Sequence, residues 1–273
     1  MTARLFLPAL ALALILSGCD ATDTVDVSDL TDLEDAAAVI AQSVSLDAGG
    51  VLSDASEAAK RFESDSGPAG CTTERDYDDS GTWNVSVACE RGNPDGRFYH
   101  TFAREATYRF LDADGQPQET PRGAQTLEHS ILSGSGTHLT PRASAVLSSL
   151  TADYIVTRAD SGMATVNGAS DRAGIQTVYG RREAQREVDY ALSLELDDVT
   201  GPRARRADWR GAVSGTVTGV YTATITLTAP GGETRTREVA RDFTITFPNG
   251  GRRARIAMGG QTFDADPATG ELL

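Results

Sequence analysis

The side chains that most often carry out catalytic chemistry are sparse in this chain. It has three histidines, His100, His129 and His138, which fall on separate segments. Glu128 adjoins His129, but adjacent residues of a strand point to opposite faces of a sheet. The sequence contains no HExxH, GxSxG, phosphate-loop or dinucleotide-loop pattern. We therefore expect the histidines to lie on the surface or in turns, and we expect neither an enzyme nor a bound cofactor.

Closely spaced carboxylates raise the question of calcium binding. The groups are Asp76, Asp78 and Asp79; Asp112 and Asp114 before Gly115; and Asp264 and Asp266. An EF-hand loop also requires further oxygen ligands and a bidentate glutamate at loop position 12, which none of these groups supplies. Asp and Gly between strands are typical of turns. Turn formation is our interpretation, with calcium binding as the alternative.

The start of the chain has the layout of an export signal. Arg4 provides a positive charge, and an apolar run of about a dozen residues extends from Leu5 to Leu16. A spanning helix needs about 20 apolar residues, so cleavage is favoured over a permanent anchor. The run ends in Leu16-Ser17-Gly18-Cys19, which resembles the bacterial lipobox.

This resemblance implies that residues 1-18 are a lipoprotein signal peptide and that Cys19 becomes a lipid-bearing N-terminus. Each buried methylene contributes about 0.8 kcal/mol, so two or three acyl chains hold a protein firmly on its membrane. Asp20 resembles the inner-membrane retention signal of enterobacterial lipoproteins, whereas other phyla use early acidic residues for surface export. We expect an envelope lipoprotein on the inner or outer membrane, facing the periplasm or the cell surface. An ordinary signal peptide with an incidental cysteine is the alternative.

Two further cysteines, Cys71 and Cys89, are candidates for a disulfide bond. The bacterial envelope is oxidising, which favours pairing. Closing a loop of this size would stabilise the fold by about 3 kcal/mol. A redox or metal pair is the alternative, but the sequence has no CxxC pattern and no histidine near these residues. A structural bridge is therefore predicted.

Negative charge is concentrated near the front of the chain. The formal net charge is −14, and Asp20 to Asp65 contributes −10, because twelve acidic residues face only Lys60 and Arg61. Nucleic-acid binding requires a basic footprint, which this balance does not supply. We interpret residues 19-30 as a solvated acidic tether.

Helical spacing follows the tether. Thr31 and Glu34 form a capping-box pattern. Apolar residues then recur at helical spacing at Leu33, Ala37, Ile40 and Val44. Gly49 and Gly50 separate them from a second, shorter apolar series. One or two short helices are expected within residues 31-66.

From Cys71 onward the apolar residues alternate with a period of two. The clearest case is Val213 to Thr228, where apolar residues share one parity and threonines the other, as a half-buried antiparallel strand requires. No helical pattern separates these strands. We expect a mainly β fold over residues 71-273, with an antiparallel, curved or partly closed sheet of meandering hairpins.

A faint internal repeat divides this region. The segment around Trp83 matches that around Tyr221 at an offset of 138 residues, and the segment around Arg104 matches that around Arg241 at an offset of 137. Two related halves, about 71-150 and 205-273, would produce such a pattern. A chance likeness between threonine- and valine-rich strands would produce it equally well.

Arginines gather in the second half of the chain, at Arg181, Arg182 and Arg186; Arg203, Arg205, Arg206 and Arg210; and Arg252, Arg253 and Arg255. They could bind lipid phosphates, lipopolysaccharide or an acidic glycan, because guanidinium pairs with phosphate and carboxylate in bidentate fashion. We favour cross-strand pairs with neighbouring acids such as Glu187 and Asp189 on a solvated face.

Two classes of function remain. The first is a non-catalytic binding or structural lipoprotein that displays a β domain to an envelope protein, glycan or lipid. The second is a carrier of a hydrophobic ligand such as lipid, because the order of elements resembles the curved sheet and helices of outer-membrane lipoprotein carriers. An apolar cavity lined by one face of Val213 to Leu227 would favour the carrier, and a filled interior would count against it. An enzyme would need a histidine, a carboxylate and a serine in one cleft.

Overall fold

The computed structural model describes residues 27–63, 70–141, 143–159, 162–179, 185–204, 209–229, 231–248 and 252–273, with side chains from Asp32 onward. The expected signal peptide (1-18), Cys19 and most of the expected tether lie outside the described residues. So do four of the clustered arginines, at positions 181, 182, 205 and 206.

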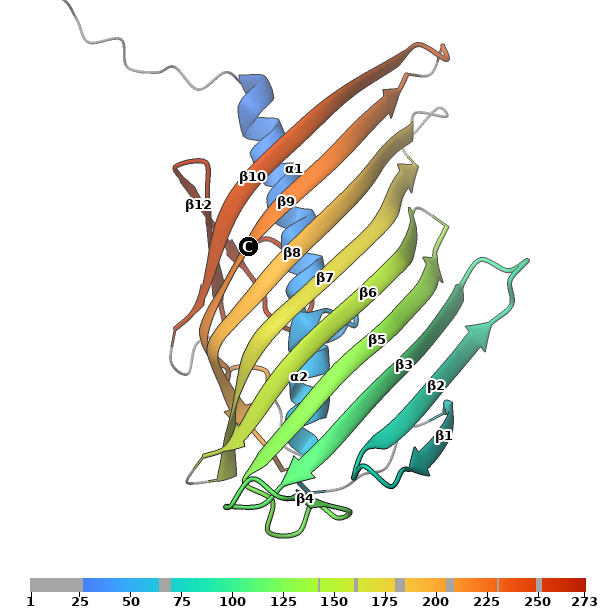
Figure 1. Ribbon diagram of the computed structural model, residues 1–273. Helices are drawn as coiled ribbons and strands as arrows, with labels where there is room; N and C mark the ends of the chain where they lie inside the picture. Colours follow the sequence, from blue (N-terminus) through green and yellow to red (C-terminus); the bar gives the residue numbers. More distant parts are fainter. Residues whose placement is uncertain are drawn as a thin grey trace, which may run out of the picture.

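Two helices precede a sheet of hairpins (Figure 1). The helices are α1 (Val27–Val44) and α2 (Val51–Lys60). The strands are β1 (Thr72–Tyr77), β2 (Trp83–Gly92), β3 (Tyr99–Leu111), β4 (Pro117–Gln118), β5 (Thr126–Leu139), β6 (Ala143–Arg158), β7 (Met163–Tyr179), β8 (Gln185–Pro202), β9 (Ser214–Thr228), β10 (Thr234–Phe247), β11 (Ala254–Met258) and β12 (Gln261–Ala265). Since α1 begins at Val27, the last four residues of the expected tether are helical.

The predicted mainly β fold is confirmed. The strands form one antiparallel 12-stranded sheet in chain order, except that β3 pairs with β5 and the short β4 pairs only with β3. The sheet is not closed, because β1 and β12 are its two edges. None of the described helices combines the length and the apolar character needed to span a membrane.

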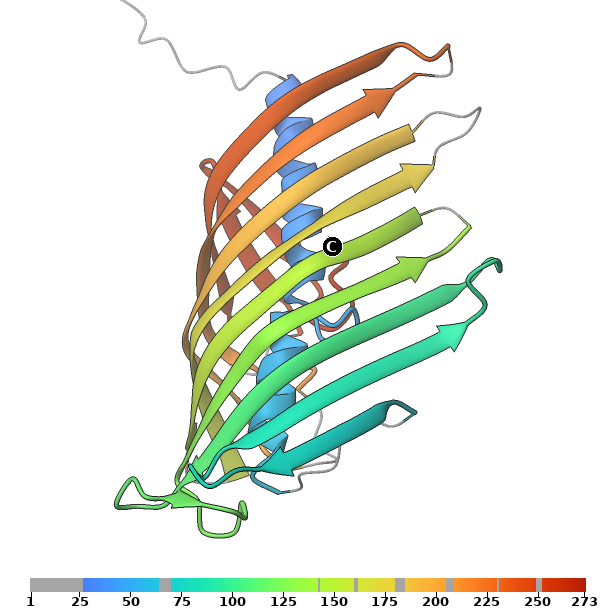
Figure 2. The same ribbon diagram turned by 45° about the vertical axis from the view of Figure 1, so that its right-hand side comes forward.

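The sheet curves around the two helices, which lie along its hollow side (Figures 1 and 2). We call the face toward the helices the inner face and the opposite one the outer face. On β9, Val217, Tyr221 and Ile225 have no exposed surface, whereas the threonines between them are exposed. The alternation in the sequence therefore separates the core from the solvent, as predicted.

Extra residues in the central strands help to bend the sheet. The extra residues are Leu132 in β5, Ser148 in β6 and one of Asp197 and Asp198 in β8, which lie opposite Asn167 of β7. Such bulges increase the local twist and bend a strand. Gly168, next to one of them, has φ +142°, and a Cβ there would collide with the Asp153 carbonyl oxygen, so this bend requires glycine.

Strand pairing gives the proposed internal repeat no support. The two matched segments do form the β2–β3 and β9–β10 hairpins. Trp83 pairs with Tyr108, but its counterpart Tyr221 pairs with Arg241 and not with Ile245, the counterpart of Tyr108. The two hairpins thus differ in register by four residues.

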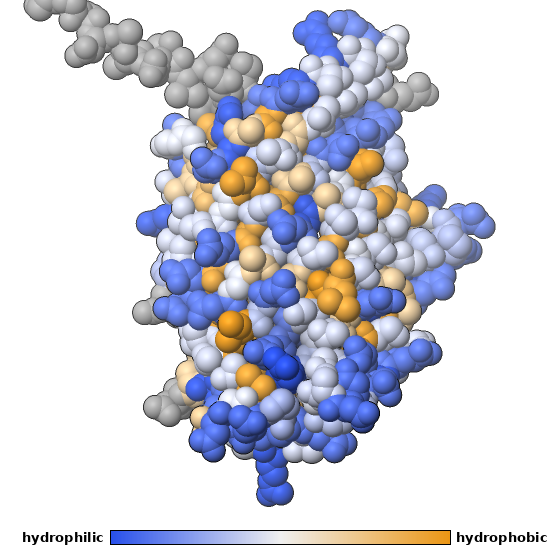
Figure 3. Space-filling view, viewed as in Figure 1, coloured by the Kyte–Doolittle hydropathy of each residue, from blue (hydrophilic) through white to orange (hydrophobic). Residues whose placement is uncertain are grey.

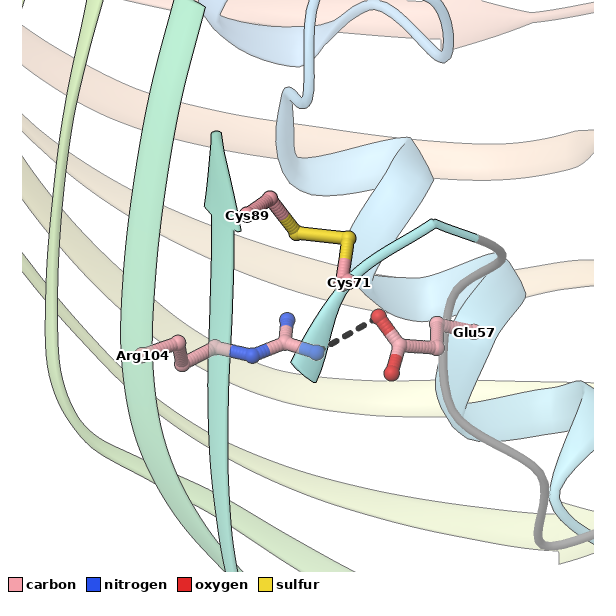
Figure 4. The surroundings of a disulfide bond; sticks show 4 residues. All are labelled: Glu57, Cys71, Cys89 and Arg104. Atoms are coloured by element: carbon pink, nitrogen blue, oxygen red, sulfur yellow. Dashed lines mark hydrogen bonds and ion pairs between the residues drawn. A yellow bond between two sulfur atoms is a disulfide. The ribbon is translucent and has the colours of Figure 1, made fainter. Parts of the chain in front are cut away.

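The predicted disulfide between Cys71 and Cys89 is present (Figure 4). It joins the residue before β1 to β2, and the two Cα atoms lie 4.4 Å apart. Among the described strands, the edge strand β1 pairs with β2 alone. The bond therefore fastens one open edge of the sheet.

Replacing both Cys71 and Cys89 by serine should lower the free energy of unfolding by about 3 kcal/mol, because the unfolded chain regains the freedom of an 18-residue loop. Urea unfolding of the variant and of the unmodified protein measures the loss. Reduced unmodified protein serves as the control and should lose the same amount. An unchanged unfolding midpoint in both samples would contradict the assignment.

Candidate functional site

Arginines of the sheet lie mainly on its inner face, and acidic residues lie mainly on its outer face. The arginines of β3 to β10 with inner parity are Arg104, Arg158, Arg172, Arg186, Arg235, Arg237 and Arg241. The acids with outer parity are Glu105, Glu128, Asp153, Asp171, Glu187, Asp189, Glu195, Asp197, Glu238 and Asp242. Within the described residues of these strands, Arg109 is the one arginine of outer parity, and it pairs with Glu128. Figure 3 views this outer face, where hydrophilic side chains surround scattered apolar ones.

The inner arginines meet the acids of the helical segment. The pairs that join this segment to the β region are Asp32 with Arg237, Asp35 with Arg186, Asp47 with Arg210, Asp54 with Arg104 and Arg172, Glu57 with Arg104, and Glu63 with Arg203. Several acids of the negatively charged N-terminal segment thus form ion pairs with arginines of the β region. The tether interpretation is restricted to the residues before α1.

The expected cross-strand pairing is wrong for Arg186, which binds Asp35 of α1. Arg203 and Arg210 lie between β8 and β9 and pair with Glu63 and Asp47 of the helical segment. Arg255 does face its cross-strand partner Asp264, with 3.7 Å between the charged atoms. The first three arginines therefore pair with the helical segment, whereas Arg255 pairs within the sheet.

Five side chains form a charge cluster between α2 and the sheet, namely Asp54, Glu57, Arg61, Arg104 and Arg172. Glu57 is 30% exposed, and the other four side chains are at most 5% exposed. Asp54 accepts hydrogen bonds from Arg104 Nη1 at 3.1 Å on Oδ1 and from Arg172 Nη2 on Oδ2. Glu57 accepts from Arg104 Nη2 at 2.5 Å, as Figure 4 shows, and from Arg61 Nη2 at 2.9 Å. The cluster thus joins α2 to both β3 and β7.

Arg172 and Arg61 extend the charge cluster to neighbouring groups. Arg172 Nη1 donates to the Gly49 carbonyl oxygen at 3.0 Å, which fixes the link between α1 and α2. The guanidinium of Arg61 lies over the Tyr108 ring, 4.6 Å from its centroid, in a cation–π contact. Three cations face two anions, so the cluster carries a formal charge of +1.

Burial and charge act in opposite directions on the acids of the cluster. Burial disfavours the ionised form of Glu57, but Arg104 and Arg61 outweigh it and hold the pKa at about 2. Burial raises the pKa of Asp54 against the lowering effect of Arg172 and Arg104. The stabilisation from Glu57 is complete above about pH 4.5 and is lost as the pH falls toward 2.

His129 lies beside this cluster and is only 1% exposed, so its expected surface or turn location is wrong. It pairs across the strands with Tyr154, and the two rings stack with centroids 6.3 Å apart. Burial lowers the pKa of His129 to about 3, and the nearby Arg61 and Arg104 add to the effect. The imidazole is therefore neutral at neutral pH.

The sheet brings a histidine, acids and a serine into one region, as an enzyme would require. His129 and Ser170 are each 1% exposed and Asp54 is 4% exposed, all beneath α2. A substrate could reach them only if the helix moved away. In the described arrangement Asp54 joins α2 to the sheet through Arg104 and Arg172, whereas His129 and Ser170 are buried side chains of β5 and β7.

The other two histidines, which seemed scattered in the sequence, are neighbours in the fold. His100 and His138 pair across β3 and β5, their ring centroids lie 5.7 Å apart, and both are exposed. Burial lowers the pKa of His100, and His138 and Arg91 add to the effect. The described residues contain no group of three or more side chains able to hold a metal ion.

One carboxylate in each group considered for calcium binding accepts hydrogen bonds within its own turn. Asp112 Oδ1 accepts from the backbone amides of Asp114 and Gln116 at 2.9 and 2.8 Å. Asp78 Oδ1 accepts in the same way from Ser80 and Thr82. Asp266 Oδ1 accepts from Ala268 at 2.7 Å. This geometry is the turn formation that the sequence suggested.

Two open recesses lie outside the charge cluster. One, of about 830 Å³, adjoins the disulfide and includes Cys89, Phe102 and Leu147. The other, of about 380 Å³, lies at the ends of the β7–β8 and β9–β10 hairpins and includes Val178 and Leu227. A scan against protein-family models and searches of curated proteins and solved structures found no match to the chain.

Replacing Asp54 by asparagine should lower the free energy of unfolding by about 3–5 kcal/mol, because Arg104 and Arg172 lose their shared buried counter-charge. Chemical unfolding measures the loss. The control is Glu233→Gln, whose pair with Arg235 is exposed and should cost less than about 1 kcal/mol. Equal losses in the two variants would show that the cluster does not hold the helix.

The unmodified protein should lose about 2 kcal/mol more stability than a His129→Gln variant when the pH falls from 6.5 to 5. The unfolded chain protonates this histidine near pH 6.5, whereas the folded protein does so only near pH 3, so acid favours unfolding over that interval. Urea unfolding at several pH values measures both slopes. Parallel slopes would indicate that His129 is solvated in the folded state.

Proposed function

We propose that the protein is a lipid-anchored component of the bacterial envelope that binds or supports a partner and catalyses no reaction. The lipobox-like Leu16-Ser17-Gly18-Cys19 supports the anchor. The single observation that carries the non-catalytic assignment is the charge cluster. Asp54, Arg104 and Arg172, which are among the chain's strongest candidates for chemistry, bind α2 to the sheet and are at most 5% exposed, so a substrate would not reach them.

The hollow side of the sheet is filled by the helices, which favours a protein that binds its partner at the surface over one that carries a hydrophobic ligand inside. A carrier would need an apolar cavity against the inner face of β9, but Val217, Tyr221 and Ile225 have no exposed surface and share one core with residues of α1 such as Ile40. A hydrophobic ligand would have to displace the helices from this face. The ion pairs of the charge cluster oppose such a displacement.

The character of the surface narrows the class of partner. The outer face presents acids and hydroxyl groups, and the acids would repel an acidic polymer. Arg186, Arg203 and Arg210, which could have bound phosphate or acidic glycans, are engaged by acids of the helical segment. A basic or neutral partner therefore fits the outer face best.

The anchor can be tested by expressing the full chain in a bacterial host and measuring the intact mass of protein extracted from its membranes. We expect a mature chain that begins at Cys19 and carries added acyl groups, whereas Cys19→Ala should abolish the modification and the membrane attachment. Cys71→Ser is the matched control and should leave the lipid in place. An unmodified mass for the unaltered protein would refute the anchor.

A further inference from the structure

The smaller recess, which we call the rim recess, lies where the β7–β8 and β9–β10 hairpins end. Its walls include Val178, Leu227 and Ala229. Val178 and Leu227 are 44% and 40% exposed, although they have the same inner parity as the buried Val188 and Ile225. The inner face therefore continues beyond the helices as an apolar surface open to solvent.

The apolar rim recess also has a cationic side chain in its wall, that of Arg235. Glu233 lines it as well, and within the described residues the Arg235 side chain, 81% exposed, pairs with the 69% exposed Glu233 at 3.1 Å. Exposed pairs of this kind contribute little, so Arg235 can exchange its partner for another anion at small cost. Apolar walls beside an accessible guanidinium match a molecule with a hydrocarbon part and a phosphate group.

The first half of α1 is paired with residues at or near the rim recess. Asp35 of α1 pairs with Arg186, which lines the recess, and Asp32 pairs with Arg237, two residues beyond Arg235 on β10. In both ribbon views α1 starts at the end of the molecule where the β9–β10 hairpin projects (Figures 1 and 2).

The distance from Cys19 to α1 is limited by the length of the chain. Eight peptide steps separate Cys19 from Val27, where α1 begins, and they span at most about 27 Å when fully extended. If Cys19 is lipidated, the rim recess is held close to the membrane. The opposite ends of the strands carry the acidic turns of Asp78 and Asp112, which an anionic bilayer would repel.

We infer that the end of the sheet with the rim recess contacts the bilayer, and that the recess takes an acyl chain of an anionic phospholipid whose phosphate binds Arg235. The volume of about 380 Å³ lies within the range of small-molecule pockets. This inference rests on the proposed anchor, which places the recess at the membrane. It adds a second contact with the bilayer that needs no covalent lipid.

The test uses the mature chain with Cys19→Ser, so that no covalent lipid is present, and two kinds of vesicle. One is pure phosphatidylcholine and the other contains phosphatidylglycerol. We expect sedimentation with the anionic vesicles, reduced about tenfold by Leu227→Asp and by Val178→Asp, because each places a charge in the apolar wall. Arg235→Gln should remove the preference for phosphatidylglycerol.

Val220→Asp is the matched control, because Val220 lies on β9 with 44% exposure but on the outer face. It should bind vesicles as the Cys19→Ser chain does, and circular dichroism shows whether each variant is folded. The inference is overturned if the Cys19→Ser chain binds neither vesicle, or if Val220→Asp reduces binding as much as folded Leu227→Asp and Val178→Asp. A dimer that Leu227→Asp disperses, without vesicle binding, would assign the recess to a second copy and would also overturn it.

The lipid anchor on Cys19 and the contact of the rim recess with the bilayer can be refuted independently of each other. Vesicle binding by the Cys19→Ser chain would persist even if the intact mass showed no lipid on Cys19 of the unaltered protein. A lipidated Cys19 together with no vesicle binding would refute the rim contact and leave the anchor in place.

Discussion

The ion pairs that Asp54 makes with Arg104 and Arg172 are the constraint on which the rest of the structure depends. One carboxylate of α2 is shared by guanidinium groups of β3 and β7, and all three side chains are at most 5% exposed. If α2 moved away from the sheet, Asp54 would lose both arginines, and the buried guanidinium groups would lose their counter-charge. Leaving buried charges without partners is strongly unfavourable. The two layers are therefore defined together, and α2 can dock in only one register.

This constraint accounts for the uneven charge of the chain. The segment from Asp20 to Asp65 carries a formal charge of −10, and the strands place arginines on the face toward it. Acids on the outer face keep the exterior negative. A sheet with this many strands and two open edges would otherwise expose its inner face, and the helices cover it with apolar residues such as Ile40 and Leu52. The helical segment thus belongs to the core of the β fold.

The sequence predicted the local elements better than the contacts between them. Two-residue alternation on β9 correctly identified a half-buried strand, and Gly49 and Gly50 correctly separated two helices. The pairing of Asp54 with Arg172 joins residues 118 positions apart, which no local pattern specifies. A signal for it was present, however, because Asp54 interrupts the apolar stripe of α2 and Arg104 shares the parity of the buried Ala106 and Tyr108. Charged residues at core positions predict buried ion pairs, and His129 was missed for the same reason.

Hydrogen–deuterium exchange of the α2 backbone amides tests most directly whether the charge cluster fixes the helix in the hollow of the sheet. A ten-residue helix is marginal on its own in water, so its protection must come from docking. If the charge cluster fixes the helix, the amides near Asp54 and Glu57 will exchange as slowly as those of the central strand β7. Rapid exchange throughout α2 beside a protected β7 would contradict this role of the charge cluster.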